Sequence, residues 1–304
     1  MEMAIPSSTW FTAAPHWQWL IVLWFFFGGL AAGCYFFATL IDLFGRPEDR
    51  PIARAGYLAV LPCLVVSGIV LIVDLSRPER FWHLLLENHT FQPIFKYWSP
   101  MSIGSWVLLA MSFFAVLSFI GALSDTGRVR WAGARQLRPP ARLGTAVALI
   151  GALLGLWLAG YTGVLLAVTN RPIWADTPLL GLLLLLSAAS IAAAFLILLA
   201  HRYRWHSPGA AALERIEVWI LALELLALIA VVVSLGPAAR PWLGAWGVLL
   251  IAGPVALGML LPLALHRRRD WLGARTPAAA ALLVLVGGFL LRVVVVMSSE
   301  GVHL

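Results

Sequence analysis

Residues 17–44 read WQWLIVLWFFFGGLAAGCYFFATLIDLF and contain one charged side chain, that of Asp42. A helix that crosses a bilayer needs about 20 mostly apolar residues, so this stretch is long enough to span one. The whole chain has the same character: 62% of its 304 residues are hydrophobic, 12% are charged, and its mean hydropathy is +0.91. Because soluble domains carry about 25% charged residues, the composition excludes a soluble globular protein and predicts an all-α polytopic membrane protein.

Seven further stretches have the length and composition of a spanning helix. Ser99 followed by Pro100 is typical of a helix N-terminus, with serine as the cap and proline in the first turn. Other prolines fall inside spans, where neighbouring helices must satisfy the freed carbonyl groups. We expect eight transmembrane helices over residues 17–44, 52–73, 100–123, 143–168, 179–200, 211–235, 243–265 and 277–297.

The basic residues are distributed unevenly between the predicted loops. The segments after the first, third, fifth and seventh spans hold 15 of the 21 Lys and Arg residues, whereas the alternate segments hold five. Cytoplasmic loops retain Lys and Arg, so both termini are predicted to lie outside and the arginine-rich loops in the cytoplasm. This topology accounts for the formal charge of +7 without a nucleic-acid partner.

The positions of histidine and cysteine bear on cofactors. Every histidine lies in a predicted loop, tail or span end, whereas a haem within the membrane needs axial ligands on facing helices. Cys34 and Cys63 lie singly in apolar stretches, without the clustered cysteines that an iron–sulfur or zinc site requires. We therefore expect no haem, no iron–sulfur cluster and no metal site in this protein.

Polar side chains of the first half gather at the outer leaflet of the predicted topology. His16 precedes the first span, Asp74 ends the second, and Tyr161 lies roughly 10 Å below the outer end of the fourth. Each has a simpler interpretation: interfacial anchoring for His16, capping of the helix end with an ion pair to Arg77 for Asp74, and helix packing for Tyr161. Together they suit a largely apolar ligand with two polar ends, which is what a quinone is.

Charged residues also lie inside the spans of the second half. Glu224 is near the middle of the sixth predicted span, Glu217 is about two turns earlier on the same helix face, and Arg292 is inside the eighth span. Charges at this depth are costly and usually pair or line a polar path. Two interpretations stay open: an ion pair between Glu224 and Arg292, or a proton path from the cytoplasm through Glu217 and Glu224.

Several short motifs follow one another along nearly the whole sequence. They are GGLAAG at 28–33, DLSRP at 74–78, SPMSIGSW at 99–106, YTG at 161–163, RPIW at 171–174 and GGFLLR at 287–292. In their order and spacing these motifs resemble those of the NrfD-type membrane subunits, a family that includes the integral subunit of polysulfide reductase.

The resemblance implies two four-helix bundles, here residues 1–170 and 171–304, with a quinone site on the outer side of the first. It implies that a quinone or quinol, of the menaquinone or ubiquinone class, exchanges electrons with a ferredoxin-like iron–sulfur subunit. That subunit would connect to a molybdopterin catalytic subunit on the periplasmic side. Matched by position, Tyr161 and Asp74 correspond to the tyrosine and the acid of the family motifs, and His16 to the histidine before the first span.

The sequence therefore predicts a quinone-reactive membrane anchor of a respiratory oxidoreductase complex in the bacterial cytoplasmic membrane. Tyr161 and His16 are expected to hydrogen-bond the quinone carbonyl groups, and Asp74 or His16 to exchange protons with it. Thr162 and Arg77 complete the expected binding site.

The outer loop over residues 74–99 is long and rich in aromatic residues, and loops of this length are usually functional. We expect it to help dock the iron–sulfur subunit. Two other functions stay open on the sequence alone. One is a transporter, and the other is a structural anchor that carries no quinone chemistry.

Overall fold

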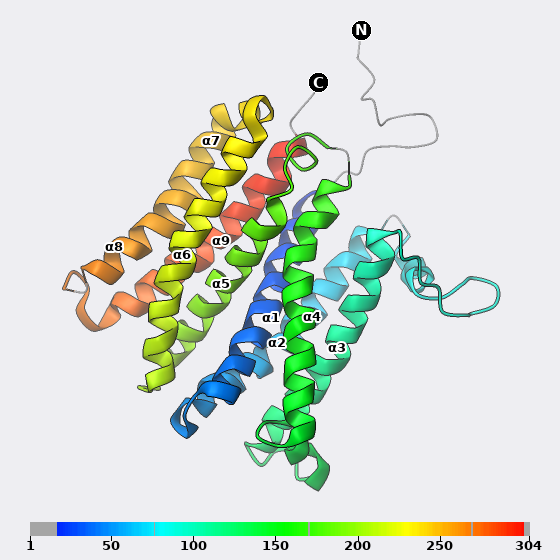
Figure 1. Cartoon of the computed structure of the whole chain (residues 1–304), viewed down its shortest axis with the longest axis vertical. Coiled ribbons are helices and arrows are strands. Elements are labelled where there is room, and N and C mark those ends of the chain that lie inside the picture. Colours follow the sequence, from blue (N-terminus) through cyan, green and yellow to red (C-terminus); the bar gives the residue numbers. More distant parts are fainter. Residues whose placement is uncertain (1–16, 76, 170, 269, 301–304) are drawn as a thin grey trace.

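The computed structural model describes residues 17–75, 77–169, 171–268 and 270–300. Within this part of the sequence the protein is all-helical, and eight helical segments are long and apolar enough to cross a membrane (Figure 1). In sequence order the segments are α1 (Trp19–Phe44), η1 (Pro47–Asp49), α2 (Arg50–Asp74), η2 (Pro78–Leu84), α3 (Pro100–Ser124), η3 (Ala132–Leu137), α4 (Arg142–Ala167), α5 (Leu180–Arg202), α6 (Pro208–Leu235), η4 (Gly236–Leu243), α7 (Ala245–Leu250), η5 (Ile251–Leu260), α8 (Leu261–Arg267), η6 (Gly273–Arg275) and α9 (Thr276–Glu300).

The eight predicted spans are confirmed, each within a few residues of its predicted ends. Hydropathy determines them because a backbone in lipid must satisfy its hydrogen bonds internally, and a helix does so. The predicted cap of α3 is also formed: the Ser99 hydroxyl oxygen accepts a hydrogen bond from the Ser102 amide, and Pro100 occupies the first turn. The sixth span begins in the same way, at Ser207 and Pro208, which is earlier than the predicted residue 211.

The seventh span is built from α7, η5 and α8 in succession. Its middle part, η5, is a π-helix that contains Pro254. Proline lacks an amide hydrogen, and its ring collides with the carbonyl group one turn earlier. The wider turn of a π-helix at this position accommodates both the missing hydrogen bond and the collision. Gly258 of η5 approaches Gly287 of α9 so closely that a Cβ on either would lie 2.6 Å or less from the Cα of the other.

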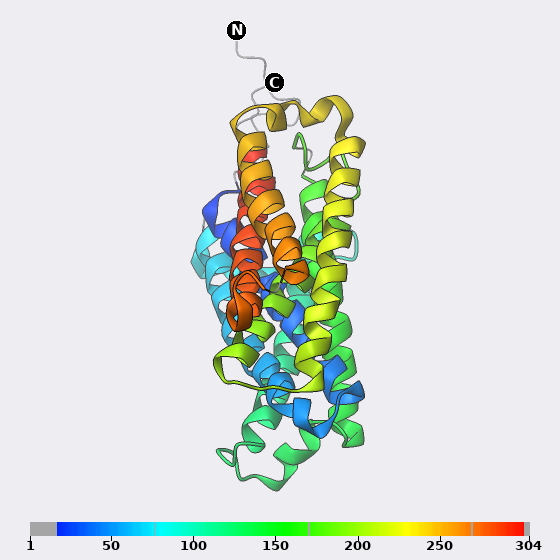
Figure 2. The same cartoon turned by 90° about the vertical axis from the view of Figure 1, so that its left-hand side faces the viewer.

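The helices pack in two groups of four spans (Figure 1; Figure 2). In the first group α1 contacts α2 and α4, and α3 contacts the same two helices. In the second group α5 contacts α6 and α9, and the seventh span contacts the same two helices. The groups meet along a seam where α1 contacts α5 and α9, and α4 contacts α5. That residues 1–170 and 171–304 are separate domains stays a prediction.

The connections that carry most of the arginines all lie at one end of the helices, the lower end in Figure 1. We call it the basic end. The start of α1 and the end of α9 lie together at the opposite end, where Trp17 stacks on Trp174 and the Ser299 hydroxyl donates to the Pro172 carbonyl. The first and last described residues thus lie on one side of the helices. Which side faces the cytoplasm stays a prediction.

Small residues allow α1 to approach α5 closely along the seam. A Cβ added at Gly33 would lie 2.5 Å from the carbonyl oxygen of Ala188 and 2.5 Å from the Cβ of Ala192. Gly29, one turn earlier, faces Ala188 and the guanidinium of Arg292. This is the contact that a GxxxG spacing is typical of.

Replacing Gly33 with alanine should destabilise the protein, because the added methyl group meets the α5 backbone, which cannot move aside cheaply. Overpacking of this kind costs about 1–3 kcal/mol. Gly160→Ala is the matched control, since it adds the same methyl group to α4 where no atom lies within 4 Å. We expect the midpoint of thermal unfolding in detergent to fall for G33A and not for G160A. Equal midpoints would contradict the close packing of α1 on α5.

Candidate functional site

A cavity of about 250 Å³ lies between the first four spans, at the end opposite the basic end. Its wall is mostly apolar and includes part of the loop between α2 and α3. The lining residues are Trp24 of α1, then Gly68, Leu71, Ile72 and Leu75 at the end of α2, then Phe81, Leu84 and Leu85 of the loop, then Met101, Gly104, Ser105, Leu108, Leu109 and Ser112 of α3, and finally Tyr161 and Leu165 of α4. A concave apolar wall with a few polar groups is the usual composition of a small-molecule site.

Tyr161 brings a phenol to this cavity. Its hydroxyl donates a 2.6 Å hydrogen bond to the carbonyl oxygen of Pro100, in the first turn of α3. Its ring stacks on Trp157, with the ring centroids 4.8 Å apart. Gly104 provides the space for the hydroxyl, because a Cβ at that position would lie 2.3 Å from Tyr161 Oη. The phenol is therefore held in one position, and its oxygen retains the capacity to accept a further hydrogen bond.

The motif at residues 99–106 does two things in the structure. Through Pro100 it supplies the acceptor that fixes Tyr161. It also fastens the end of the preceding loop to α3: the Ser102 hydroxyl oxygen accepts a 3.1 Å hydrogen bond from the Lys96 amide, and the Trp106 indole donates a 2.8 Å bond to the Ile94 carbonyl. The loop and the tyrosine are thus held by the same turns of α3.

The loop between α2 and α3 has a defined shape and an aromatic surface. An isolated bridge pairs Leu86 with Pro93, and Glu87 fixes the turn between them. The Thr90 hydroxyl and amide, with the His89 amide, donate to the Glu87 carboxylate, and these hydrogen bonds lower the pKa of Glu87. Aromatic residues are enriched in protein–protein interfaces. Those exposed on this loop are Phe81, Phe91, Phe95, Tyr97 and Trp98.

Trp24 is a cavity residue that the sequence analysis missed. It is 4% exposed, and its indole N–H forms no hydrogen bond to the described residues. The indole Nε1 lies toward Gly28, 3.7 Å from where a Cβ on that glycine would lie, on the same side as the buried Ser67 hydroxyl. Nothing singled it out among 15 tryptophans, most of which are typical of membrane interfaces.

The predicted site residues lie at different places around the cavity. Tyr161 lines it, whereas Asp74 is half-buried at the end of α2, between residues of the wall. Asp74 is the last residue of α2, and among the described residues it forms no ion pair with Arg77, which is exposed. Thr162 is buried, and its hydroxyl donates to a carbonyl of its own helix. His16 lies outside the described residues. The quinone-binding and proton-exchanging roles of these residues stay predictions.

Arg292 forms the centre of a buried polar group at the seam. Its Nε donates to the Phe25 carbonyl of α1 at 3.0 Å, and its Nη1 donates to Ser187 Oγ of α5 at 3.0 Å and to a carbonyl one turn earlier in α9 at 2.7 Å. Ser187 and Ser190 interact in turn with the Glu224 carboxyl group of α6. Among the described residues Glu224 and Arg292 form no direct ion pair, one of the two interpretations left open, although their charges interact electrostatically and both groups interact with Ser187.

Arg138 is a second buried charge, which the sequence did not distinguish from its neighbours in an arginine-rich loop. Its guanidinium donates to both carboxylate oxygens of Asp42 at 2.7 Å, and also to Asp125 and to the Arg50 carbonyl. Asp42 is the single charge of the first span and lies 96 residues away in the sequence. The cluster therefore ties the connection between α3 and α4 to the basic end of α1.

A family model described as polysulphide reductase, NrfD, matches residues 11–302. The chain belongs to the NrfD family. The motif resemblance is thereby confirmed, and the similar proteins agree with it. Protein NrfD of Escherichia coli is 26% identical over 93% of this chain and 95% of its own length. A polysulfide reductase chain of Wolinella succinogenes is 29% identical over 57% of this chain and 55% of its own length. A selenate reductase subunit of Mesobacillus selenatarsenatis is 30% identical over 31% of this chain and 20% of its own length.

In these matches the protein thus spans about half of the polysulfide reductase chain and a fifth of the selenate reductase subunit, and nearly all of the E. coli protein. The motif that carries the phenol, Tyr161 to Gly163, lies within the part matched by the NrfD model. Among the described residues of this NrfD-family protein, no three His, Cys, Asp or Glu side chains come together in a group that could hold a metal ion.

Gly104→Ala should destabilise this NrfD-family protein by about 1–3 kcal/mol, because the new methyl group meets the Tyr161 hydroxyl. Gly68→Ala is the matched control in the same cavity wall, where an added Cβ has no neighbour within 4 Å. A double-mutant cycle isolates the contact: in a Tyr161→Ala background the cost of G104A should largely disappear. Denaturant titration in mixed micelles measures each free energy of unfolding. A cost of G104A that is the same in both backgrounds would contradict the contact.

Proposed function

We propose that this NrfD-family protein is the quinone-reactive membrane subunit of an oxidoreductase complex in the bacterial cytoplasmic membrane. It exchanges electrons between the quinone pool and an iron–sulfur subunit on the periplasmic side. The observation that carries the proposal is the apolar cavity between the first four spans, with a fixed phenol and the side chain of Trp24 in its wall.

The size of the cavity suits a quinone head group. Pockets that enclose drug-sized ligands measure roughly 300–1,000 Å³, so a cavity of about 250 Å³ takes a head group of one or two rings and excludes an isoprenoid tail. The tail stays in the surrounding lipid. Leu109 of the wall is 47% exposed on the surface of α3, so the cavity adjoins the lipid-facing surface from which a quinone arrives.

The polar groups match the two ends of a quinone ring. Trp24 donates its indole N–H to one carbonyl group. The Tyr161 hydroxyl, which donates to Pro100 without a ligand, turns to donate to the other carbonyl, or keeps its bond and accepts from a quinol hydroxyl. Quinol formation takes up two protons with two electrons, and Asp74 and His16 are the groups proposed to exchange them.

The partner is proposed to dock on the loop between α2 and α3. Phe81, Leu84 and Leu85 of this loop belong to the cavity wall, so a ferredoxin-like iron–sulfur subunit seated on it lies next to the bound head group. The molybdopterin catalytic subunit would follow in the same complex. Retention of the basic end in the cytoplasm directs this loop to the periplasm. The names of two similar proteins, one a chain of polysulfide reductase and the other a subunit of selenate reductase, support membership in a complex of this kind.

The two other functions that the sequence allowed are less well supported. Similar proteins named as reductase subunits favour a subunit of a redox complex over a transporter. The cavity with its fixed phenol favours quinone chemistry over a purely structural anchor.

Tyr161→Phe should lower quinone-linked turnover of the purified complex by about 10- to 100-fold. A hydrogen bond to a group that becomes charged contributes about 1.5–3 kcal/mol, and each 1.4 kcal/mol is a factor of ten. Turnover of the same complex with a soluble dye that bypasses the membrane subunit should not change. The two rates, measured with a short-tailed quinone analogue and with the dye, separate the quinone step from the chemistry of the partner.

Tyr203→Phe serves as the control, because Tyr203 lies at the basic end and stacks on Trp205, away from the cavity. It should leave both rates unchanged. Normal quinone-linked turnover in Y161F would contradict the assignment of Tyr161 to the quinone site. Loss of the partner subunits from purified Y161F would instead indicate that Tyr161 has a structural role.

A further inference from the structure

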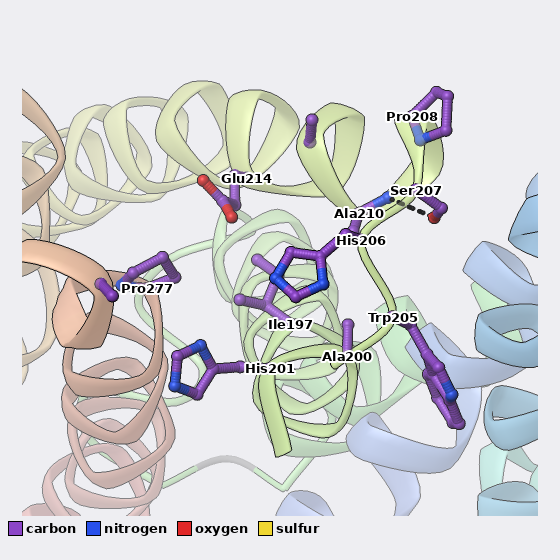
Figure 3. Close-up of a pocket in the computed structure, with 12 residues that line it drawn as sticks. Ile197, Ala200, His201, Trp205, His206, Ser207, Pro208, Ala210, Glu214 and Pro277 are labelled. Carbon is purple, nitrogen blue, oxygen red and sulfur yellow. Dashed lines mark hydrogen bonds between the residues drawn. The ribbon is translucent and has the colours of Figure 1, made fainter. Parts of the chain in front are cut away.

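A second cavity, of about 540 Å³, lies at the basic end of the last four spans. At about 30 Å³ for each water molecule, it has room for more than ten. Three titratable side chains line it: His201 of α5, His206 of the connection to α6, and Glu214 of α6. Figure 3 shows these three around the cavity, with Pro277 of α9 on another side. The cavity therefore has space for water, and side chains that can exchange protons with that water, next to the start of α6.

Glu217 lies one turn of α6 beyond Glu214 and is fully buried. Neither of its carboxylate oxygens takes part in a hydrogen bond within the described residues. The group that faces it is the imidazole of His266, from α8, whose Nε2 is 3.4 Å from Glu217 Oε2. Burying a carboxylate with neither a hydrogen bond nor an opposite charge is costly, so Glu217 either holds a proton itself or faces a charged His266.

The contacts of His266 fix how many protons this pair carries. His266 Nδ1 lies 2.9 Å from the carbonyl oxygen of Pro262. A carbonyl oxygen can only accept, so Nδ1 carries a hydrogen, and a neutral His266 presents the bare lone pair of Nε2 to Glu217. A neutral imidazole requires a protonated Glu217, and a charged imidazole requires an ionised one. If the pair held no proton, the lone pairs of His266 Nε2 and the Glu217 carboxylate would face each other. If it held two protons, two hydrogen-bond donors would face each other.

The surroundings leave one side of the pair close to water. Glu214 is the other titratable group that acts electrostatically on Glu217, and it lines the cavity. On the far side Leu221, which is fully buried, lies between Glu217 and Glu224 on α6. Seven residues of helix separate these two glutamates by roughly 10 Å, and Glu224 interacts with Ser187 and Ser190 instead.

We propose that Glu217 and His266 form a proton-exchange site that holds a single shared proton and exchanges it with the basic-end cavity by way of Glu214. The ligand of this site is the proton, delivered by water. The site lies in the second group of helices, at the end opposite the apolar cavity, so it does not depend on the proposed quinone chemistry. The proton path expected from the sequence is thereby divided into two parts at Leu221. Glu217 and His266 lie on one side of Leu221. Glu224 and Arg292 lie on the other.

Carbodiimide labelling locates the shared proton. Dicyclohexylcarbodiimide adds to a protonated carboxyl group in an apolar site: the carboxyl oxygen bonds to the central carbon of the reagent, the proton moves to one nitrogen, and the acyl group then shifts to nitrogen. The product keeps every atom of both reactants, so mass spectrometry of the full-length protein, labelled in native membranes at neutral pH, finds it. The exposed Glu48 is the control, because it lies at the surface and not in an apolar site, and it should react at least tenfold more slowly.

Two variants make the labelling decisive. Fast labelling of Glu217 in the native protein supports the shared proton and assigns it to Glu217. Labelling that is absent there but present in His266→Gln supports it equally and assigns the proton to His266. Labelling in neither protein overturns the proposal. Glu224→Gln, beyond Leu221, should leave the rate at Glu217 unchanged, and a change of more than about threefold would contradict the separation of the two polar groups.

Infrared spectroscopy after transfer to D₂O tests the route of exchange. The carboxyl or imidazolium band that disappears in Glu217→Gln is the band of the shared proton, and it should shift within minutes in the native protein. Glu214→Gln should keep this band and slow its shift several-fold. A shift as fast as in the native protein would rule out exchange by way of Glu214. If Glu217→Gln removes no band of either kind, the proposal fails whatever the labelling shows.

Discussion

One buried guanidinium, that of Arg292, joins the two groups of helices. Its hydrogen bonds reach the Phe25 carbonyl of α1 and the Ser187 hydroxyl of α5, as well as its own helix. An arginine within a spanning segment is tolerated when such partners surround it, so α1, α5 and α9 must meet at this depth for the fold to exist. Gly29 follows from the same requirement, because a Cβ there would lie 3.0 Å from the Arg292 guanidinium. Helix α1 is thus held against α5 and α9 by the Arg292 hydrogen bond and by the close approach at Gly29.

The two cavities differ in the composition of their walls, and each composition suits the position of the cavity in the fold. The one between the first four spans is mostly apolar, adjoins the exposed surface of α3, and has a few polar groups from α1, α3 and α4 in its wall. The one at the basic end has two histidines and a glutamate in its wall, and it lies where the helices emerge toward water. The lipid-soluble ligand proposed for the first cavity and the proton proposed for the second therefore have separate sites, in different groups of helices and at opposite ends.

The spans could be predicted from the sequence because hydropathy, proline and the serine caps act over neighbouring residues. Tyr161 could be placed near the outer end because depth follows from helix rise, but its acceptor, the Pro100 carbonyl, depends on how α3 and α4 pack. Contacts between residues far apart in the sequence could not be predicted either, because they also depend on how the helices pack. Asp42 and Arg138 are 96 residues apart, and nothing local pairs them. Of the two interpretations of Glu224 and Arg292, the direct ion pair is not formed, because the position of the Ser187 hydroxyl beside Arg292 depends on the rotation of α5, which the sequence does not give. Thr162 shows the usual alternative for a hydroxyl in a spanning helix, a bond to its own backbone.

The way α3 begins has a thermodynamic consequence. Its first turns hold the end of the loop through Ser102 and Trp106, and hold the phenol of Tyr161 through the Pro100 carbonyl. A molecule that draws the phenol away from Pro100 changes the turn on which the loop rests, and a protein that seats on the loop restrains the turn that holds the phenol. If a ligand in the cavity and a protein on the loop both act on this turn, their binding has one coupling free energy, and each changes the affinity of the other by the same factor.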